Sequence, residues 1–150
     1  MAEHNILTDP FLHEPKGIST AADGLVYVAD GAGSGDWVTT TQYLNAELAD
    51  VSSPSLKYVP VPYAGVVEKV VGVLHGAIAT ANSTLTVKNA AGVSMGTISV
   101  PFSGSAAGQV FTLTPVSNNT VADNSFITIE SDGASSNVVV MTFTVVVRGT

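Results

Sequence analysis

The chain has 150 residues, of which 45% are hydrophobic and only 11% are charged, whereas an ordinary soluble protein has about 25% charged residues. This length allows one domain of ordinary size, and the hydrophobic share excludes a disordered chain. With so few charges, part of the apolar surface is expected to lie against other chains. We therefore expect the protein to assemble with copies of itself, with a homotrimer favoured over a dimer.

The net charge of −7 comes from 12 acidic and 5 basic residues. The basic residues are dispersed along the chain: Lys16, Lys57, Lys69, Lys88 and Arg148. A surface that binds nucleic acid needs several neighbouring cations to neutralise phosphates, and an anionic membrane attracts the same kind of cluster. The sequence therefore predicts neither nucleic acid nor membrane as a partner.

Two kinds of sequence feature that bear on the cellular compartment are missing. The chain has no cysteine, so disulfides and thiolate metal sites are excluded. Residues 1–8 lack a basic segment followed by an apolar run, and no apolar stretch reaches the roughly 20 residues that span a bilayer. We expect no secretory signal and production in a cytoplasm.

Residues 1–50 are predicted to form an extended N-terminal arm. Prolines and glycines recur through the first 36 residues, where only Leu25–Asp30 has the apolar, β-branched character of a strand. A helix of one or two turns is plausible only within Thr41–Asp50. The candidates for contact with partner chains are the large apolar side chains of the arm and their neighbours: Phe11, Leu12, His13, Pro15, Lys16, Ile18, Leu25, Tyr27, Val28, Trp37 and Tyr43.

Aromatic residues are concentrated before residue 64: Tyr27, Trp37, Tyr43, Tyr58 and Tyr63. Such side chains are favoured at protein interfaces because they bury a large area at a small entropic cost. The alternative is that they cap the core of the body, and the sequence favours neither interpretation.

Residues 51–150 are predicted to form a β-sandwich body of the jelly-roll or Greek-key type. Runs of β-branched residues alternate with turn residues at intervals of roughly 8 to 12 residues, as in sandwiches and barrels. Hairpin turns are expected at residues 89–92 and 131–134, where glycine supplies a positive φ. The expected strands are 56–62, 65–75, 83–88, 95–101, 109–114, 125–131 and 137–148.

The last predicted strand is apolar on both faces. Val139, Met141, Phe143, Val145 and Val147 make one face, and the other is also largely apolar. The same holds for residues 66–67 and 70–71. In a two-layer protein this pattern predicts that another chain, or the arm, covers the outer face.

No catalytic, metal or cofactor site is predicted, and we expect a protein that is not an enzyme. His4, His13 and His75 have no metal-ligand spacing. Residues 31–35 (GAGSG) lack the third glycine and the following helix of a dinucleotide site, so a flexible turn is favoured. Asp23, Asp30 and Asp36 do not match a calcium loop, and glycan hydrolysis is a distant third hypothesis.

Two stretches carry a family resemblance. Residues 13–37, HEPKGISTAADGLVYVADGAGSGDW, resemble a segment of the head decoration, head-fibre and tail-fibre-like proteins of tailed bacteriophages. The stretches from AGVV at residues 64–67 through GAIATANSTLTV at 76–87 to GSAAG at 104–108 resemble capsid decoration (cement) proteins of the β-sandwich type. Together these stretches extend over most of the chain.

The resemblance implies a virion protein on the outer surface of the capsid, with the major capsid protein as partner and no cofactor. An extended arm suits such a role, because an ordered strand can pair with a neighbour's exposed sheet edge through main-chain hydrogen bonds. Many weak copies then bind together with high avidity. The alternative is a head- or tail-fibre module that binds a host receptor or carbohydrate, which predicts an exposed aromatic platform flanked by polar groups.

Overall fold

The computed structural model describes residues 25–32 and 35–150 of the chain. The chain divides into two compact units, residues 1–40 and residues 41–150. The described part of the first unit is an antiparallel hairpin of β1 (Leu25–Ala29) and β2 (Gly35–Thr39). The second unit consists of β3 (Thr41–Leu48), β4 (Pro54–Val61), β5 (Gly65–Leu74), β6 (Ser83–Asn89), β7 (Ser94–Val100), β8 (Val110–Leu113), β9 (Thr120–Val121), β10 (Ser125–Asp132) and β11 (Met141–Gly149).

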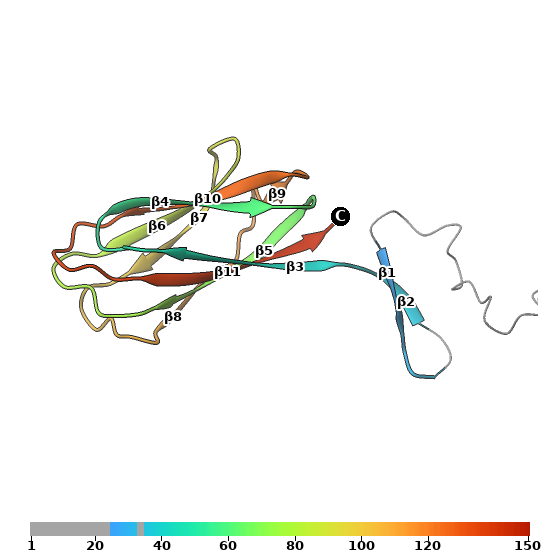
Figure 1. Ribbon diagram of the computed structural model, residues 1–150, viewed down its shortest axis with the longest axis horizontal. Coiled ribbons are helices and arrows are strands. Elements are labelled where there is room, and N and C mark those ends of the chain that lie inside the picture. Colours follow the sequence, from blue (N-terminus) through green and yellow to red (C-terminus); the bar gives the residue numbers. More distant parts are fainter. Residues whose placement is uncertain (1–24, 33–34) are drawn as a thin grey trace, which may run out of the picture. The chain divides into compact units, whose positions relative to one another are not determined.

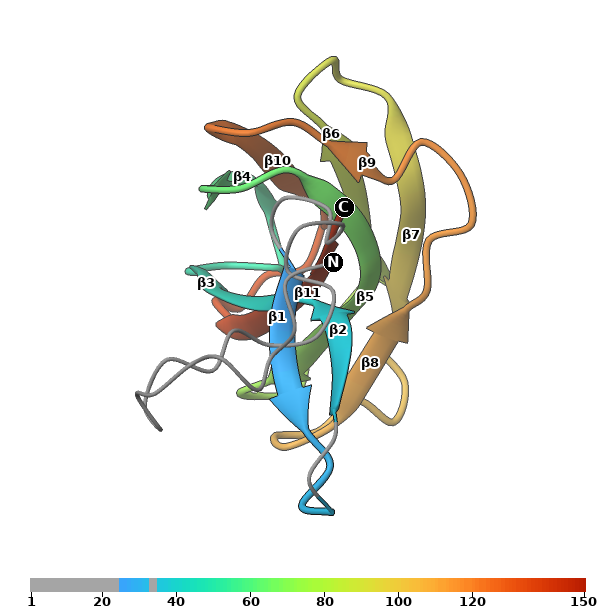
Figure 2. The same cartoon turned by 90° about the vertical axis from the view of Figure 1, so that its right-hand side faces the viewer.

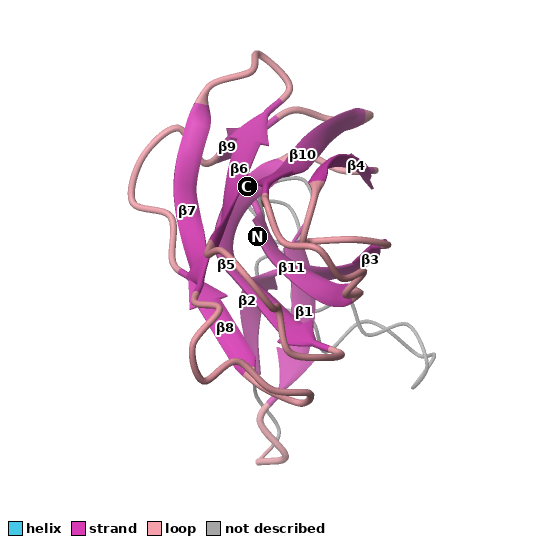
Figure 3. Ribbon diagram, turned by 90° about the vertical axis from the view of Figure 1, so that its left-hand side faces the viewer, coloured by secondary structure: helices cyan, strands magenta, loops and turns pink. Residues whose placement is uncertain are grey.

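The second unit is a sandwich of two antiparallel sheets (Figures 1 and 2). One sheet has the strand order β4-β10-β6-β7, and the other has the order β3-β11-β5-β8. β9 pairs with Gly65 and Val66 of β5, beyond the residues that pair with β8. Figure 3 shows strands and loops and no helix among the described residues. The prediction of an all-β sandwich is confirmed.

The hydrophobic core lies between the two sheets. The predicted inner face of the last strand is confirmed, because Met141, Phe143, Val145 and Val147 are each at most 2% exposed. Each side chain of this kind contributes about 1.5–3 kcal/mol through burial. The opposite sheet supplies, among others, fully buried residues of β4, β6 and β10: Val61, Leu85, Val87, Ile127 and Ile129.

A bulge in β5 explains why apolar residues there occur at both parities. The register of β5 against β11 shifts between Val146 and Val147, which leaves Glu68 as the extra residue. Val67 and Val70 therefore both point into the core and are fully buried, although they are three residues apart. Val66 and Val71 are half-buried.

The short helix predicted within Thr41–Asp50 is wrong, because these residues form β3. Leu44, Ala46 and Leu48 alternate along the strand and pack against the core, and the whole strand pairs with β11. Pairing with a long apolar strand outweighs the weak local preference for a helix. The structural division of the chain falls between residues 40 and 41, ten residues before the predicted end of the arm.

Of the two predicted hairpins, only the first forms. Asn89 accepts a hydrogen bond from the Gly92 N–H at 2.8 Å, and Gly92 has a φ of +77° between β6 and β7. The hairpin predicted at residues 131–134 is wrong, because β10 and β11 belong to different sheets. Turn residues predict a change of chain direction, but they do not determine which strands pair.

A buried polar cluster joins two crossing loops at one end of the sandwich. The carbonyl of Val51 accepts hydrogen bonds of 2.7 Å from the hydroxyls of both Ser83 and Ser131. Gly133 lies against the same segment, since a Cβ at this position would be 2.4 Å from the Val51 carbonyl oxygen. The β10–β11 loop can therefore approach the β3–β4 loop this closely only with glycine at position 133.

The Asp50 carboxylate binds both loops at the same end of the sandwich. Its Oδ1 accepts hydrogen bonds from the N–H groups of Ser52 at 2.8 Å and Val139 at 3.1 Å, and its Oδ2 accepts one from the Ser53 hydroxyl at 2.5 Å. Burial opposes ionisation, but these hydrogen bonds outweigh it and hold the pKa of the Asp50 carboxyl below its ordinary value. The ionised carboxylate thus links the two loops.

Candidate interaction surfaces

The hairpin of the first unit has one face built on an aromatic pair. Tyr27 of β1 lies opposite Trp37 of β2, and their rings meet edge to face with centroids 5.3 Å apart. Leu25 shares this face, and the three side chains are half-buried. A cross-strand aromatic pair of this kind contributes about 0.2–1 kcal/mol to the hairpin.

The opposite face of the hairpin carries exposed valines. Val26, Val28 and Val38 are 47%, 51% and 39% exposed. Their side chains lie on one face because Val26 pairs with Val38 and because Val28 is two residues along β1. A two-stranded hairpin is at best marginally stable in water by itself, so apolar residues on both faces indicate packing against another surface.

The predicted turn at residues 31–35 is confirmed for the described residues of this stretch, Gly31, Ala32 and Gly35. Gly31 has a φ of +77°, and the N–H of Ala32 donates to the Asp30 carboxylate at 2.8 Å. A side chain on Gly35 would lie 2.2 Å from the Val28 carbonyl oxygen, so glycine is needed there for the close approach of β1 and β2.

The outer face of the five-stranded sheet mixes apolar and polar side chains. On β11, Thr142, Thr144 and Val146 are half-buried, whereas Val138, before the strand, is 77% exposed. Thr144 donates a hydrogen bond of 2.9 Å to Asn45 on the neighbouring β3. Within the described residues, the outer face predicted to be covered is thus partly accessible.

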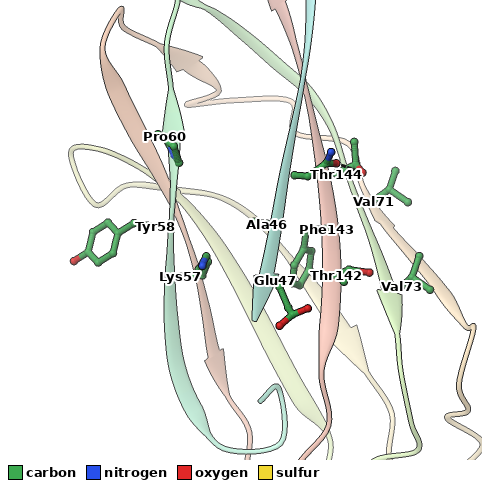
Figure 4. Close-up of a pocket in the computed structure, with 11 residues that line it drawn as sticks. Ala46, Glu47, Lys57, Tyr58, Pro60, Val71, Val73, Thr142, Phe143 and Thr144 are labelled. Carbon is green, nitrogen blue, oxygen red and sulfur yellow. Dashed lines mark hydrogen bonds between the residues drawn. The ribbon is translucent and has the colours of Figure 1, made fainter. Parts of the chain in front are cut away.

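A groove of about 690 Å³ is lined by residues of both sheets of the sandwich (Figure 4). Its polar lining includes Glu47 from β3, Lys57 from β4 and Thr142 from β11. Tyr58 also borders the groove, but its ring projects away from the other labelled side chains (Figure 4). The remaining lining residues are Asn45, Ala46, Pro60, Val71, Val73, Phe143 and Thr144. This composition suits hydrogen bonding and apolar contact.

The predicted interface residues fall into three groups. Leu25, Tyr27 and Trp37 share one face of the hairpin, and Val28 lies on the other. Tyr43 belongs to the second unit, where it is 67% exposed on β3. The others lie outside the described residues: Phe11, Leu12, His13, Pro15, Lys16 and Ile18.

Sequence reasoning missed several exposed apolar residues. Val26 and Val38 were detectable from the alternation of residues 25–29 and 35–39, once the second run is read as a strand. Phe126, at 38% exposed, was detectable because it precedes the buried Ile127 by one position. The pairing that brings it beside Tyr58 has no local signal.

Across residues 25–32 and 35–150, no group of three or more His, Cys, Asp or Glu side chains is arranged to hold a metal ion. His75 is exposed, with its Nε2 3.2 Å from the Thr142 hydroxyl. In the same part of the chain, no helix is long and apolar enough to cross a membrane.

Comparisons with known proteins identify similar folds. No protein-family model matches the chain, and no curated protein matches its sequence. A chain from the cyanophage Pam1 capsid asymmetric unit superposes with a TM-score of 0.53 at 13% identity, covering 87% of this chain and 99% of that one. At this identity the similarity establishes the fold alone.

Two other solved structures superpose less closely. The module CsCBM6-3 from Clostridium stercorarium, solved with cellobiose, gives a TM-score of 0.45 at 13% identity and covers 86% of this chain and 84% of its own. Eiger TNF from S. frugiperda gives 0.44 at 8% identity, covering 75% of this chain and 94% of its own.

Proposed function

We propose that this protein is a structural component of a bacteriophage particle, a capsid decoration (cement) protein. It binds the outer surface of the head and stabilises it by bridging capsid subunits. Its partners in this proposal are the major capsid protein and further copies of the same chain, as a homotrimer. The observation that carries the proposal is the β1–β2 hairpin, which forms part of a compact unit separate from the sandwich.

The chemistry of the hairpin fits attachment. β1 contains no charged residue, and Asp36 is the only one in β2. The valine face formed by Val26, Val28 and Val38 contributes to binding as its apolar area is removed from water, at about 25 cal/mol per Å². Each copy binds weakly through so small an element, and many copies on one shell bind together.

The fold similarity is compatible with this role. The Pam1 chain, which comes from a structure of a capsid asymmetric unit, is covered almost completely by the superposition, at 99% of its length. The sparse charge of the present chain, 11% of residues, also suits a protein that functions within a large assembly.

The proposal is tested by binding to phage heads that lack the protein, prepared from the phage that encodes it. Full-length protein is expected to cosediment with these heads, and Val28→Asp, which buries a charge in the proposed contact, is expected to reduce occupancy at least tenfold. Val116→Asp is the matched control, because Val116 is 92% exposed on the sandwich.

Two results would contradict the proposal. Equal occupancy of the Val28→Asp and Val116→Asp variants would exclude the hairpin as the attachment element. Antibody labelling confined to the tails of intact particles would exclude decoration of the head and favour a fibre. Sedimentation equilibrium of the free protein tests the trimer directly.

A further inference from the structure

The outer face of the four-stranded sheet carries an exposed apolar edge. β4 and β10 pair so that Phe126 lies opposite Pro60 and Thr128 lies opposite Tyr58. Tyr58 is 57% exposed and Leu56, two residues before it, is 47% exposed. These side chains point away from the core, because Val59, Val61, Ile127 and Ile129 point into it.

Tyr58 is held in place by its neighbour. The rings of Tyr58 and Phe126 meet edge to face, with centroids 5.3 Å apart and planes at 69°. Tyr58 is the more exposed of the two residues, at 57% against 38%, and Figure 4 shows its side chain pointing away from the other labelled side chains. A ring fixed by such a contact loses little conformational freedom when a ligand stacks on it.

Polar side chains adjoin the aromatic pair on the same face. Lys88 of β6 and Tyr58 of β4 flank Thr128 of β10 in register, and Thr128 itself is buried, at 7% exposed. Lys88 forms an ion pair with Glu130, and both side chains are partly exposed, at 28% and 36%. The accessible face therefore passes from an aromatic edge to the Lys88–Glu130 ion pair.

This arrangement matches the chemistry of a sugar ring. A pyranose has a face of C–H groups that stacks on an aromatic ring and a rim of hydroxyls that accept and donate hydrogen bonds, and carbohydrate sites combine a few placed polar groups with apolar contact area. The net charge of −7 opposes binding of polyanions, and Lys88 is neutralised by Glu130. The complementary ligand is a neutral oligosaccharide.

We propose that the outer face of the four-stranded sheet binds neutral oligosaccharides, with a pyranose ring stacked on Tyr58 and hydroxyls of the oligosaccharide bonded to the partly exposed Lys88–Glu130 pair. Phe126 is a positioning residue, because it holds the Tyr58 ring. The site lies on the sandwich and does not depend on the hairpin or on attachment to a shell.

The test uses full-length protein on a glycan array of neutral and acidic glycans, followed by affinity electrophoresis in gels containing the neutral polysaccharide that binds best. Binding to at least one neutral glycan is expected. Tyr58→Ala should weaken the affinity about tenfold or more, and Phe126→Leu, which removes the edge-to-face contact, should weaken it less. Tyr43→Ala is the matched control, since Tyr43 is similarly exposed, at 67%, on the other sheet.

The outcomes separate clearly. An array with no neutral glycan bound, binding restricted to acidic glycans, or equal affinity of the Tyr58→Ala and Tyr43→Ala variants would each overturn the proposal. Thermal unfolding of each variant excludes misfolding as the cause of lost binding. Variants that lose sugar binding should still bind phage heads, so failure of this proposal is distinguishable from failure of the capsid role.

Discussion

The hairpin and the sandwich differ in how far they remove their apolar side chains from water. Both are built from short, β-branched and aromatic strands, but the sandwich places its apolar residues between two sheets, where Val145 and Ile127 are fully buried. Within the described part of its own unit, the hairpin has no second layer, and its valine face is 39–51% exposed. The difference indicates that the sandwich is stable by itself, whereas the hairpin depends on what it contacts.

The largest expected effect concerns the hydrophobic core of the sandwich. Phe143→Ala leaves a cavity at a side chain that is 2% exposed, and it should lower the free energy of unfolding by about 3–5 kcal/mol. Val138→Ala, five residues away and 77% exposed, should change it by less than about 0.5 kcal/mol. Urea denaturation followed by circular dichroism measures both, and similar losses would mean that the core is misassigned.

The next effect concerns the crossing of the two loops. Gly133→Ala places a Cβ 2.4 Å from the Val51 carbonyl oxygen, so the backbone must shift, at a cost of about 1–3 kcal/mol. Gly76→Ala is the control, because its Cβ would meet only Val139 at 3.6 Å, an ordinary contact. If the melting temperatures of the two variants agree, the loops do not cross as closely as described.

A smaller, pH-dependent effect is expected at Asp50. Its pKa is lower in the folded than in the unfolded protein, so the carboxylate stabilises the fold above its ordinary pKa of 3.8, and this contribution is lost as the pH falls through the folded value. Asp50→Asn should therefore cost about 1–2 kcal/mol at pH 7 and progressively less below about pH 4.

The control for this measurement is Asp123→Asn, which removes a charge from an exposed loop. Chemical denaturation from pH 7 to pH 2 compares the three proteins. A constant difference between wild type and Asp50→Asn over the whole range would show that the hydrogen bonds to Asp50 do not depend on its ionisation.

The smallest expected effect concerns the separation of the two units. Trp37→Ala removes the aromatic contact with Tyr27, yet it should alter the free energy of unfolding of the sandwich by less than about 0.5 kcal/mol, because Trp37 belongs to the other unit. Thermal unfolding monitored by the β-sheet signal tests this. A loss of more than about 1 kcal/mol in the free energy of unfolding would show that the sandwich depends on the hairpin for its stability.

Much of the sandwich could be predicted from the sequence, because its signal is local. Alternation in residues 125–131 identifies β10, and the long run of β-branched and apolar residues at 139–147 identifies β11. β3 was missed because Leu44, Ala46, Glu47 and Leu48 are residues common in helices, and only pairing with β11 makes this segment a strand. β9 is too short, at two residues, to leave a pattern.

The candidate surfaces were less predictable than the fold. Tyr27 and Trp37 could be nominated as aromatics of the arm, but their contact depends on β2, a strand that the glycines around residues 31–35 concealed. Tyr58 and Phe126 are 68 residues apart in the sequence, and only the β4–β10 pairing makes them neighbours. Surfaces assembled across strands carry no signal in either strand alone.

The chain has a single tryptophan, and that residue lies in the hairpin. Emission excited at the red edge of the absorption band therefore originates from Trp37, while the sandwich, which contains Tyr43, Tyr58 and Tyr63, contributes almost nothing to it. The wild-type protein thus carries an intrinsic fluorescent label at its proposed point of attachment, and the wavelength of its emission maximum reports on the polarity around Trp37.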